Sequence, residues 1–378
     1  MSNQAGKVPD KRILVICPFP YDVAAGQRLK YEQYFSDWRS IGFHIDISPY
    51  MDEKMWGVVY KRGAYLEKIL GVFRGHGRRL LDLFRIRRYD IVYVFMWVTP
   101  LGTTIFERLV RCLSRRMIYD IEDNVLLGQE IPDADHSNAI IRFLKSPAKM
   151  RYLIGKADCV ITSSPFLNET CLKISENKNC FYISSSVDTD RFIPVYRYTN
   201  DRKVTIGWTG TFSSKPYIDL LRDVFKALAK RVQFKLKIIG NFDWNDIEGV
   251  ELEVVQWDKS KEVADLQDID IGVYPLPMDE WVNGKSGLKA IQYMAFGLPV
   301  VASAVGTTPL LITTSENGLL VRTTEEWLDA LERLVKDPQL RQRLGSAARN
   351  SAVDNYSTSV ISKQYRKVLE KCMGHKND

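Results

Sequence analysis

Short apolar runs alternate with longer amphipathic stretches along the first half of this chain. Helices, with apolar residues three and four positions apart, are predicted at 27–40, 103–114 and 165–174. Buried strands are predicted at 12–17, 43–47, 91–96, 117–121, 159–162 and 180–184. Strands that alternate with helices are typical of a parallel sheet covered on both faces. The pattern therefore predicts one doubly wound α/β domain.

A second alternation begins after a polar stretch at 195–203. Its strands are predicted at 204–208, 234–239, 252–255, 269–274, 300–302 and 319–321, and its helices at 218–231, 259–266, 324–336 and 338–350. The chain has 378 residues, and single cores stop growing at roughly 250–300 residues. We therefore predict an N-terminal domain at 1–194, a linker at 195–203 and a C-terminal domain at 204–356. A last helix, within 357–378, could pack back on the N-terminal domain.

Cysteine and histidine are sparse and scattered. The six cysteines form no CxxC pair and the four histidines no cluster, so neither a zinc site nor a disulfide framework is predicted. The polar stretch 1–12 lacks the apolar core of a signal peptide. The longest apolar run, 91–98, is too short to cross a bilayer. These features favour a cytoplasmic protein without a bound metal.

Positive charge is concentrated in one segment. The net charge is +7, and residues 61–88 hold nine Lys and Arg against two acidic residues, Glu67 and Asp82. Apolar residues such as Leu66 and Phe73 are interleaved with these charges. The mixture predicts a basic amphipathic helix or helix pair that faces an anionic membrane surface. The alternative is a solvated helix with one face in the protein core. A basic segment also suits nucleic acid, but nothing here resembles a nucleic-acid-binding motif, so no such partner is predicted.

One segment carries the clearest chemical signal: Gly284-Lys-Ser-Gly-Leu-Lys-Ala-Ile-Gln-Tyr-Met-Ala-Phe-Gly-Leu-Pro-Val-Val-Ala-Ser303. It predicts a glycine-containing loop, a short helix and a buried strand. Lys285 and Lys289 lie at the N-terminus of this helix, where unpaired backbone N–H groups and the helix dipole favour an anion. A cationic loop of this kind suits a diphosphate.

This segment resembles the donor-binding segment of retaining glycosyltransferases with the GT-B fold, and the chain resembles glycosyltransferase family 4. In the second half the resemblance also rests on Ile206-Gly-Trp-Thr-Gly210 and Lys237-Ile-Ile-Gly240. In the first half it rests mainly on Tyr182-Ile-Ser-Ser-Ser-Val-Asp-Thr-Asp-Arg-Phe-Ile-Pro194. The resemblance implies two Rossmann-like doubly wound domains facing a central cleft. It also implies a nucleotide-diphosphate sugar as co-substrate in the C-terminal domain, with no metal and no other cofactor.

The chain departs from the family at one pair of positions. The family commonly has two glutamates eight positions apart, and their places are here Gly284 and Gln292. Gln292 can still hydrogen-bond the ribose hydroxyls, whereas Gly284 cannot contact the sugar as a carboxylate does. Lys285, Asn283 or Asp279 could compensate. Phosphate chemistry is therefore better supported than the identity of the donor sugar.

The resemblance implies a set of donor-binding residues. The residues implied for the diphosphate are Gly210, Thr211, Lys215, Lys285, Ser286, Gly287, Leu288 and Lys289. Lys289 would also stabilise the negative charge of the leaving phosphate. Trp257 would stack on the nucleobase or line its pocket, and Gln292 would bind the ribose. The alternatives are an ordinary helix start for the lysines, a plain turn at Gly210, and packing or surface roles for Trp257 and Gln292.

The resemblance is less specific for the residues on the acceptor side. Gly26 and Arg28 lie in a loop that has an acceptor-side position in the family. Asp120 and Asp123 follow the strand where many relatives carry a histidine near the reacting sugar. Either aspartate could orient the acceptor hydroxyl or accept its proton, or could instead cap the segment that follows. His136 is a weaker candidate.

Two D-x-D sequences are discounted as metal ligands. Asp188-Thr-Asp190 falls in the interdomain segment and Asp268-Ile-Asp270 at a strand start, and neither has neighbouring ligands in the sequence.

These features together predict a metal-independent retaining glycosyltransferase. It would move a sugar from a nucleotide-diphosphate sugar to a glycan or lipid-linked acceptor in bacterial surface polysaccharide biosynthesis, such as that of lipopolysaccharide. We expect it in the cytoplasm or peripherally on the inner face of the cell membrane. One rival is a non-catalytic sugar-nucleotide-binding partner of another transferase, because the first glutamate is missing. Another is a sugar-nucleotide epimerase or a phosphorylase of the same fold, although an epimerase would be expected to cluster histidines and carboxylates in its cleft.

Overall fold

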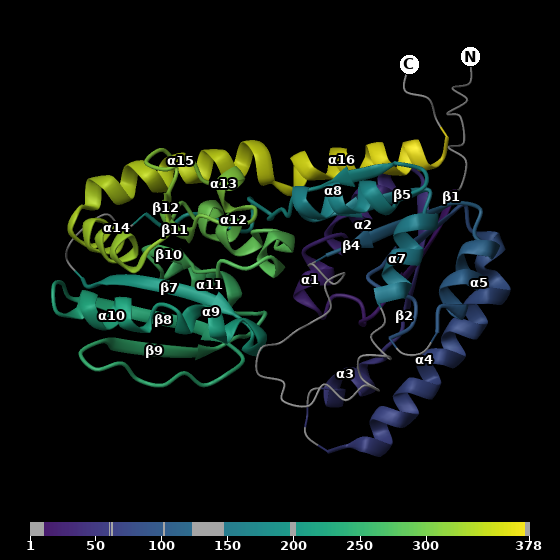
Figure 1. Ribbon diagram of the computed structural model, residues 1–378, viewed down its shortest axis with the longest axis horizontal. Helices are drawn as coiled ribbons and strands as arrows, with labels where there is room; N and C mark the ends of the chain where they lie inside the picture. Colours follow the sequence, from purple (N-terminus) through teal and green to yellow (C-terminus); the bar gives the residue numbers. More distant parts are fainter. Residues whose placement is uncertain are drawn as a thin grey trace, which may run out of the picture. The chain divides into compact units, whose positions relative to one another are not determined.

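The chain divides into two compact units, each built on one six-stranded parallel sheet with helices against it (Figure 1). The computed structural model describes residues 11–59, 61, 63–100, 103–122, 147–196 and 202–374. Unit 1 comprises Met1–Ile183 with Ser362–Asp378, and unit 2 comprises Ser184–Ile361. The predicted α/β class with two Rossmann-like halves is confirmed.

In unit 1 the strand order is β2-β1-β3-β4-β5-β6. The strands are β1 (Lys11–Cys17), β2 (Phe43–Pro49), β3 (Ile91–Phe95), β4 (Met117–Ile121), β5 (Cys159–Thr162) and β6 (Cys180–Tyr182). β3 and β4 are buried along their whole length, as expected for inner strands covered on both faces, and Asp120 is the charged residue of β4. In register, Val15 of β1 lies between Ile47 of β2 and Tyr93 of β3.

The helices of unit 1 are mostly short, with one long exception. They are α1 (Ala25–Arg28), η1 (Glu32–Tyr34), α2 (Phe35–Ser40), α3 (Glu53–Val59), α4 (Tyr65–Arg85), η2 (Ile86–Arg88), α5 (Ile105–Leu113), α7 (Pro147–Lys156) and α8 (Pro165–Ile174). Helix α4 is a single 21-residue helix. The basic segment 61–88 therefore forms one helix with a 3-10 turn after it, and a pair of α-helices does not form there.

In unit 2 the strand order is β12-β11-β10-β7-β8-β9. The strands are β7 (Val204–Gly210), β8 (Phe234–Gly240), β9 (Glu251–Gln256), β10 (Ile271–Tyr274), β11 (Val300–Ser303) and β12 (Leu319–Val321). The helices are η4 (Phe212–Ser214), α9 (Lys215–Asp219), α10 (Arg222–Ala229), α11 (Glu262–Gln267), η5 (Trp281–Gly284), α12 (Leu288–Ala295), α13 (Thr308–Leu311), α14 (Thr324–Lys336) and α15 (Pro338–Tyr356). α10 and α14 contribute to one apolar core, and α12 contributes to a second one.

Two predicted helices are interrupted. The helix predicted at 27–40 is split into α1, η1 and α2, because Tyr31 takes a non-helical backbone and its ring is buried against Tyr93 and Phe95. The helix predicted at 218–231 begins earlier, with Pro216 in its first turn, and breaks between α9 and α10. At Tyr31, contacts distant in sequence outweigh local helix periodicity.

The boundary between the units falls after Ile183, earlier than the predicted end at residue 194. The segment 184–194 belongs to unit 2, where the Val187 N–H donates to the Tyr356 carbonyl at 3.0 Å and the Phe192 ring lies 5.0 Å from the Phe296 ring. The last helix, α16 (Thr358–Cys372), contributes its residues from Ser362 onward to unit 1.

Candidate functional site

The strand order of unit 2 predicts a ligand site at the carboxyl ends of its inner strands β7 and β10. Strand β7 lies next to β8 on one side and β10 on the other, and the chain order reverses between β7 and β10. Ligands of open α/β sheets bind beyond the carboxyl ends of the strands at such a switch point. Gly210 ends β7 here, and η5 and α12 follow β10. The predicted donor-site residues of both segments thus come from the two strands that border the switch point.

Gly287 shapes the start of α12. Its φ is +75°, the left-handed region that side chains rarely adopt. A Cβ at this position would lie 2.3 Å from Leu311 Cδ1, so only glycine fits. The turn brings Leu288 and Lys289 to the first positions of α12, where backbone N–H groups lack intrahelical acceptors.

Lys289 joins α12 to the segment after β7. Its Nζ donates to Ser214 Oγ at 3.2 Å and lies 4.9 Å from the centre of the Trp208 ring. A Cβ on Gly210 would meet that same ring at 2.2 Å and Ser214 Oγ at 2.6 Å. The structure therefore brings Lys289 and Gly210 together with Ser214, which the sequence did not single out, and the Thr211 N–H donates to Ser214 Oγ at 3.1 Å.

The loop before α12 is held in place by its own contacts. The Lys285 carbonyl accepts a hydrogen bond from Thr307 Oγ1 at 2.9 Å, and Lys285 Nζ lies 5.8 Å from the Trp281 ring centre. Ser286 is buried, and Leu288 and Lys289 are half-buried. A cationic, partly enclosed loop with oriented N–H groups can hold an anion such as a diphosphate.

The two family glutamate positions have different surroundings. Gly284 is buried at the end of η5, and Gln292 is buried on α12 with 5% of its surface exposed. Asp279, a candidate to replace the missing carboxylate, accepts a hydrogen bond from the Val282 N–H at 3.1 Å and so caps η5.

Lys215 is tied to a second cluster. Its Nζ lies 3.0 Å from Asp219 Oδ2, and Asp219 also accepts hydrogen bonds from Trp244 and Arg222. Burial alone would raise the pKa of Asp219, but these hydrogen bonds outweigh it and hold the pKa below its ordinary value. The charge of Lys215 is therefore balanced within α9.

Trp257 follows β9 directly. It is 37% exposed, and its backbone N–H donates to the Gly240 carbonyl at 2.7 Å. A half-exposed indole at the carboxyl end of the sheet offers a flat apolar face to a ligand.

In unit 1 the predicted catalytic Asp120 is enclosed. It has no exposed surface, its Oδ1 lies 2.9 Å from Lys30 Nζ, and Tyr93 OH donates to its Oδ2. Burial raises its pKa, with Lys30 and Tyr93 acting in the opposite direction. Asp120 therefore holds Lys30 and Tyr93 in the core and does not face solvent. No local sequence pattern predicts this pairing, because Lys30 lies 90 positions before Asp120.

A different carboxylate lies beside the predicted acceptor-side loop. A Cβ on Gly26 of α1 would lie 3.3 Å from Glu122 Oε2, and Glu122 is half-buried. Arg28 is 7% exposed. Glu122 lies in the sequence between Asp120 and Asp123, the two aspartates that the sequence analysis singled out, and was not itself predicted. Asp123 and His136 lie outside the described residues.

The D-x-D sequences serve local structure. Asp188 Oδ1 accepts backbone N–H groups of Asp190 and Arg191, and Asp268 pairs with Lys237 at 3.2 Å. Within the described ranges, no group of three or more His, Cys, Asp and Glu residues is arranged to hold a metal ion.

Comparison with known proteins identifies the C-terminal part. Residues 203–337 match the family model "Glycosyl transferases group 1". A D-inositol 3-phosphate glycosyltransferase from Corynebacterium aurimucosum is 36% identical over 93 residues, which are 24% of this chain and 22% of that protein. The D-inositol 3-phosphate glycosyltransferase from Saccharomonospora viridis is 43% identical over 72 residues, which are 18% of this chain and 17% of that protein. The chain thus spans about a fifth of the length of these curated relatives.

Solved structures extend the likeness to both units. Sucrose-phosphate synthase from Thermosynechococcus elongatus has a TM-score of 0.71 at 18% identity, covering 96% of this chain and 99% of that chain. HepE from Anabaena, in complex with UDP-glucose, has a TM-score of 0.64 at 14% identity, covering 95% and 99%.

Two parallel Rossmann-like sheets with this likeness define a protein of the GT-B fold. Its segment 203–337 is similar to the group 1 glycosyl transferases.

Proposed function

We propose that this protein is a glycosyltransferase that takes its sugar from a nucleotide-diphosphate sugar bound to unit 2. The observation that carries the proposal is the meeting of α12 and the end of β7. Lys289, Ser214 and the glycines Gly210 and Gly287 converge there at the switch point of the sheet. The group 1 glycosyl transferase match covers the same segments.

In this proposal the diphosphate lies at the N-terminus of α12. Lys285, Lys289 and the N–H groups of residues 286–288 stabilise the negative charge that grows on the leaving phosphate. The Gln292 amide hydrogen-bonds the ribose, and Trp257 faces the base. No metal is needed, because the lysines and the helix dipole supply the positive charge. HepE was solved with UDP-glucose, so a UDP-sugar is the first donor to examine.

We further propose a retaining reaction on a glycan or lipid-linked acceptor, in the biosynthesis of a bacterial surface polysaccharide at the cytoplasmic side of the membrane. In a retaining mechanism of this class the leaving phosphate itself helps to accept the acceptor proton. A strong protein base is then unnecessary, and this agrees with the enclosure of Asp120 between Lys30 and Tyr93.

Thermal unfolding with nucleotides tests the donor site. A ligand that binds only the folded state stabilises it, by about 2.7 kcal/mol at a concentration one hundred times its Kd. We expect one of UDP, GDP and ADP to raise the melting temperature, and CMP, which has a single phosphate, to have little effect. If no nucleoside diphosphate raises it, the donor site is refuted.

A non-catalytic sugar-nucleotide-binding role is the second candidate, since Gly284 supplies no carboxylate to the donor sugar. Release of the nucleoside diphosphate from a matching sugar nucleotide separates the two. Turnover by the purified protein supports the enzyme. Tight donor binding without turnover, in the presence of lipid and glycan acceptors, supports the non-catalytic role.

A further inference from the structure

Helix α4 buries its polar and small residues and exposes its large apolar ones. Its buried residues are Gly71, Gly75, Arg79 and Asp82, which recur at three- and four-residue spacing and so share one face. The two glycines permit a close approach to the rest of unit 1. A Cβ on Gly71 would lie 2.7 Å from Met55, and one on Gly75 would lie 2.6 Å from the Tyr50 ring.

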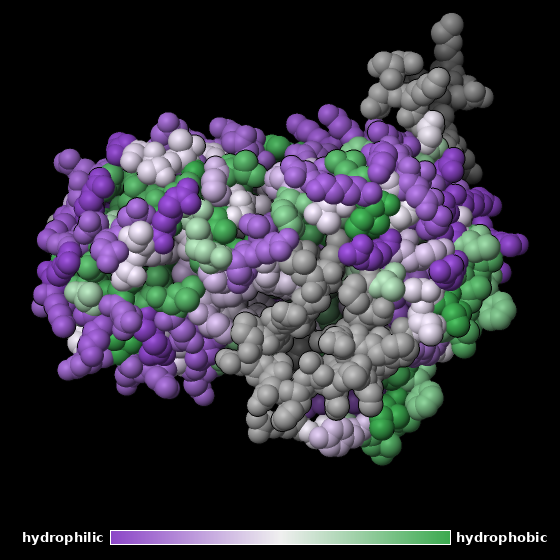
Figure 2. All heavy atoms as spheres, viewed as in Figure 1, coloured by the Kyte–Doolittle hydropathy of each residue, from purple (hydrophilic) through white to green (hydrophobic). Residues whose placement is uncertain are grey.

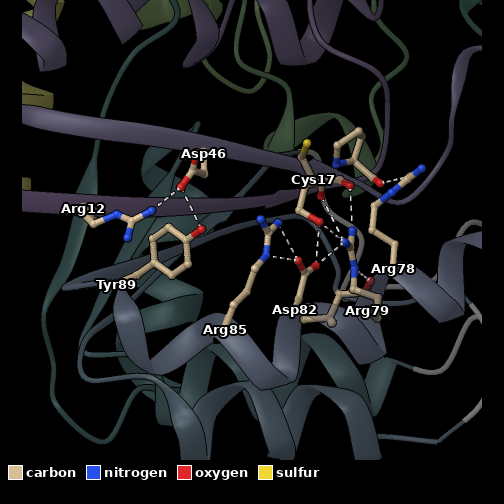
Figure 3. A network of polar contacts seen from close by, with 11 residues as sticks. Arg12, Cys17, Asp46, Arg78, Arg79, Asp82, Arg85 and Tyr89 are labelled. Atoms are coloured by element: carbon tan, nitrogen blue, oxygen red, sulfur yellow. Dashed lines mark hydrogen bonds and ion pairs between the residues drawn. The ribbon is translucent and has the colours of Figure 1, made fainter.

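Arg79 anchors this inner face (Figure 3). It is fully buried, and its guanidinium donates to the carbonyls of Cys17, Ser48 and Val98, which lie at or just beyond the ends of β1, β2 and β3. It also pairs with Asp82 at 3.0 Å. The orientation of α4 is therefore fixed by a hydrogen-bonded charge. Rotation of the helix about its axis would leave that charge without its hydrogen-bond partners.

The opposite face of α4 is a continuous apolar surface. Its exposed large side chains are Tyr65, Leu66, Ile69, Leu70, Phe73, Leu80, Leu81 and Phe84. Phe73 is 70% exposed and Phe84 is 84% exposed. The neighbouring helix α5 adds Ile105 and Leu109, and the two helices touch through His76 and Phe106. Figure 2 shows this apolar patch over α4 and α5. We call these ten residues the α4–α5 apolar surface.

Basic side chains border the α4–α5 apolar surface. By helix geometry Arg74, Arg78 and Arg85 follow one flank of the exposed stripe of α4, where Arg74 pairs with Asp52 at 2.6 Å and Arg85 with Asp82 at 2.8 Å. Arg87 and Arg88 of η2 are exposed just beyond Phe84, and Arg108 is exposed on α5. Glu67 is the exposed acidic residue on α4. An apolar surface with a cationic border matches the acyl and headgroup layers of an anionic leaflet.

We propose that the α4–α5 apolar surface inserts into the surface of a bilayer containing anionic phospholipid and holds unit 1 there. A patch with so many large apolar side chains exceeds what monomeric proteins usually leave in water. A second copy of this chain is a poorer occupant, because a two-fold contact would bring the same basic borders together. In the described ranges no helix is long and apolar enough to span a membrane, so the contact would be interfacial.

This inference adds a membrane surface to the proposed function but does not depend on it, because vesicle binding needs no donor. It would hold unit 1 at the membrane surface, where the proposed lipid-linked acceptor lies. A protein that binds vesicles without transferring sugar would refute the activity alone, and one that transfers sugar without binding vesicles would refute the membrane surface alone.

The test is sedimentation of the full chain with vesicles of phosphatidylcholine and phosphatidylglycerol in about equal parts, against phosphatidylcholine alone. We expect binding to the anionic vesicles that weakens as salt is added. The triple variant Leu66→Gln, Phe73→Gln, Phe84→Gln should bind at least about tenfold more weakly, because each side chain loses part of its apolar transfer energy. The pair Arg87→Gln, Arg88→Gln should lower binding to the anionic vesicles about tenfold, because each cation near the surface contributes to it.

The matched control is Ile193→Gln, Leu220→Gln, Leu310→Gln, which changes three exposed apolar residues of unit 2. It should bind vesicles as the unchanged protein does. Insertion has its own readout: brominated lipids should quench a tryptophan at Phe73→Trp but not one at Leu310→Trp. A protein that stays in solution with anionic vesicles at low ionic strength overturns the proposal. So does a triple variant that binds normally, or a protein that self-associates through this face and ignores vesicles.

Discussion

At the scale of single residues, candidate site residues of the same charge have different surroundings in the structure. Lys289 reaches Ser214 and the Trp208 ring, whereas Lys215 is paired with Asp219 inside its own helix. Asp120 is enclosed by Lys30 and Tyr93, whereas Glu122 lies beside Gly26. Residue type and spacing predicted which segments matter. They did not predict which contacts each of these side chains makes within the protein.

Lys289→Ala should weaken binding of the matching nucleoside diphosphate by about 10- to 100-fold, since a charge-assisted hydrogen bond contributes about 1.5–3 kcal/mol. Isothermal titration with that nucleotide measures the change. Lys226→Ala is the control, because Lys226 of α10 forms a surface ion pair with Glu248. Equal affinity in the Lys289→Ala variant and the unchanged protein would remove Lys289 from the donor site.

Asp219→Asn should lower the free energy of unfolding near pH 7, with a difference that shrinks on acidification. The pKa of Asp219 is held below its ordinary value in the folded protein. Its ionised form therefore contributes stability above about pH 4, and this contribution is lost as the pH falls through the folded pKa. Urea unfolding between neutral pH and about pH 3 measures it. The exposed Asp223→Asn on α10 is the control, and a difference that grows on acidification would contradict the assignment.

At the scale of secondary structure, the strands were predictable and helix orientation was not. All twelve strands lie where the apolar runs placed them, within a few residues at each end. Helix α4 shows the limit of this approach. Its sequence predicts an amphipathic helix, and an ordinary surface helix would turn its apolar side inward. The buried Arg79 and the two close glycines turn that side outward.

Arg79→Met should destabilise unit 1 by about 3–5 kcal/mol, because it removes the fully buried guanidinium that pairs with Asp82 and donates to three backbone carbonyls of unit 1. Hydrogen exchange of the β1 and β3 amides, together with urea unfolding, measures the loss. Arg88→Met changes an exposed arginine of the same segment and should cost less than about 0.5 kcal/mol. Similar losses in the two variants would show that the buried network is not the anchor of α4.

At the scale of the whole molecule, the end of the chain completes the unit that its beginning forms. Tyr365 of α16 is 2% exposed, and its ring lies 4.8 Å from that of Tyr34 and 5.9 Å from that of Trp38. Arg366 forms an ion pair with Asp37 of α2, and Lys371 lies over the Phe181 ring. Unit 1 is therefore discontinuous in sequence, and its stability depends on contacts with residues of α16.

Tyr365→Ala should destabilise unit 1 by about 3–5 kcal/mol, as expected for loss of a large buried aromatic side chain. The change should appear as faster hydrogen exchange in unit 1, with exchange in the β7 and β8 strands of unit 2 unchanged. Tyr356→Ala, at the less buried end of α15, serves as the control within unit 2. Equal acceleration in both units would mean that they unfold together.

The sequence by itself determined the two α/β halves, their strands and the cationic glycine-containing segment before α12. These follow from periodicity and from short motifs, which are local properties of the chain. Only the tertiary structure decided which face of α4 is exposed, that Asp120 is enclosed by Lys30 and Tyr93, and that Arg366 of α16 pairs with Asp37. Each of these depends on contacts between residues far apart in sequence, and the free energies of such contacts outweigh local preference.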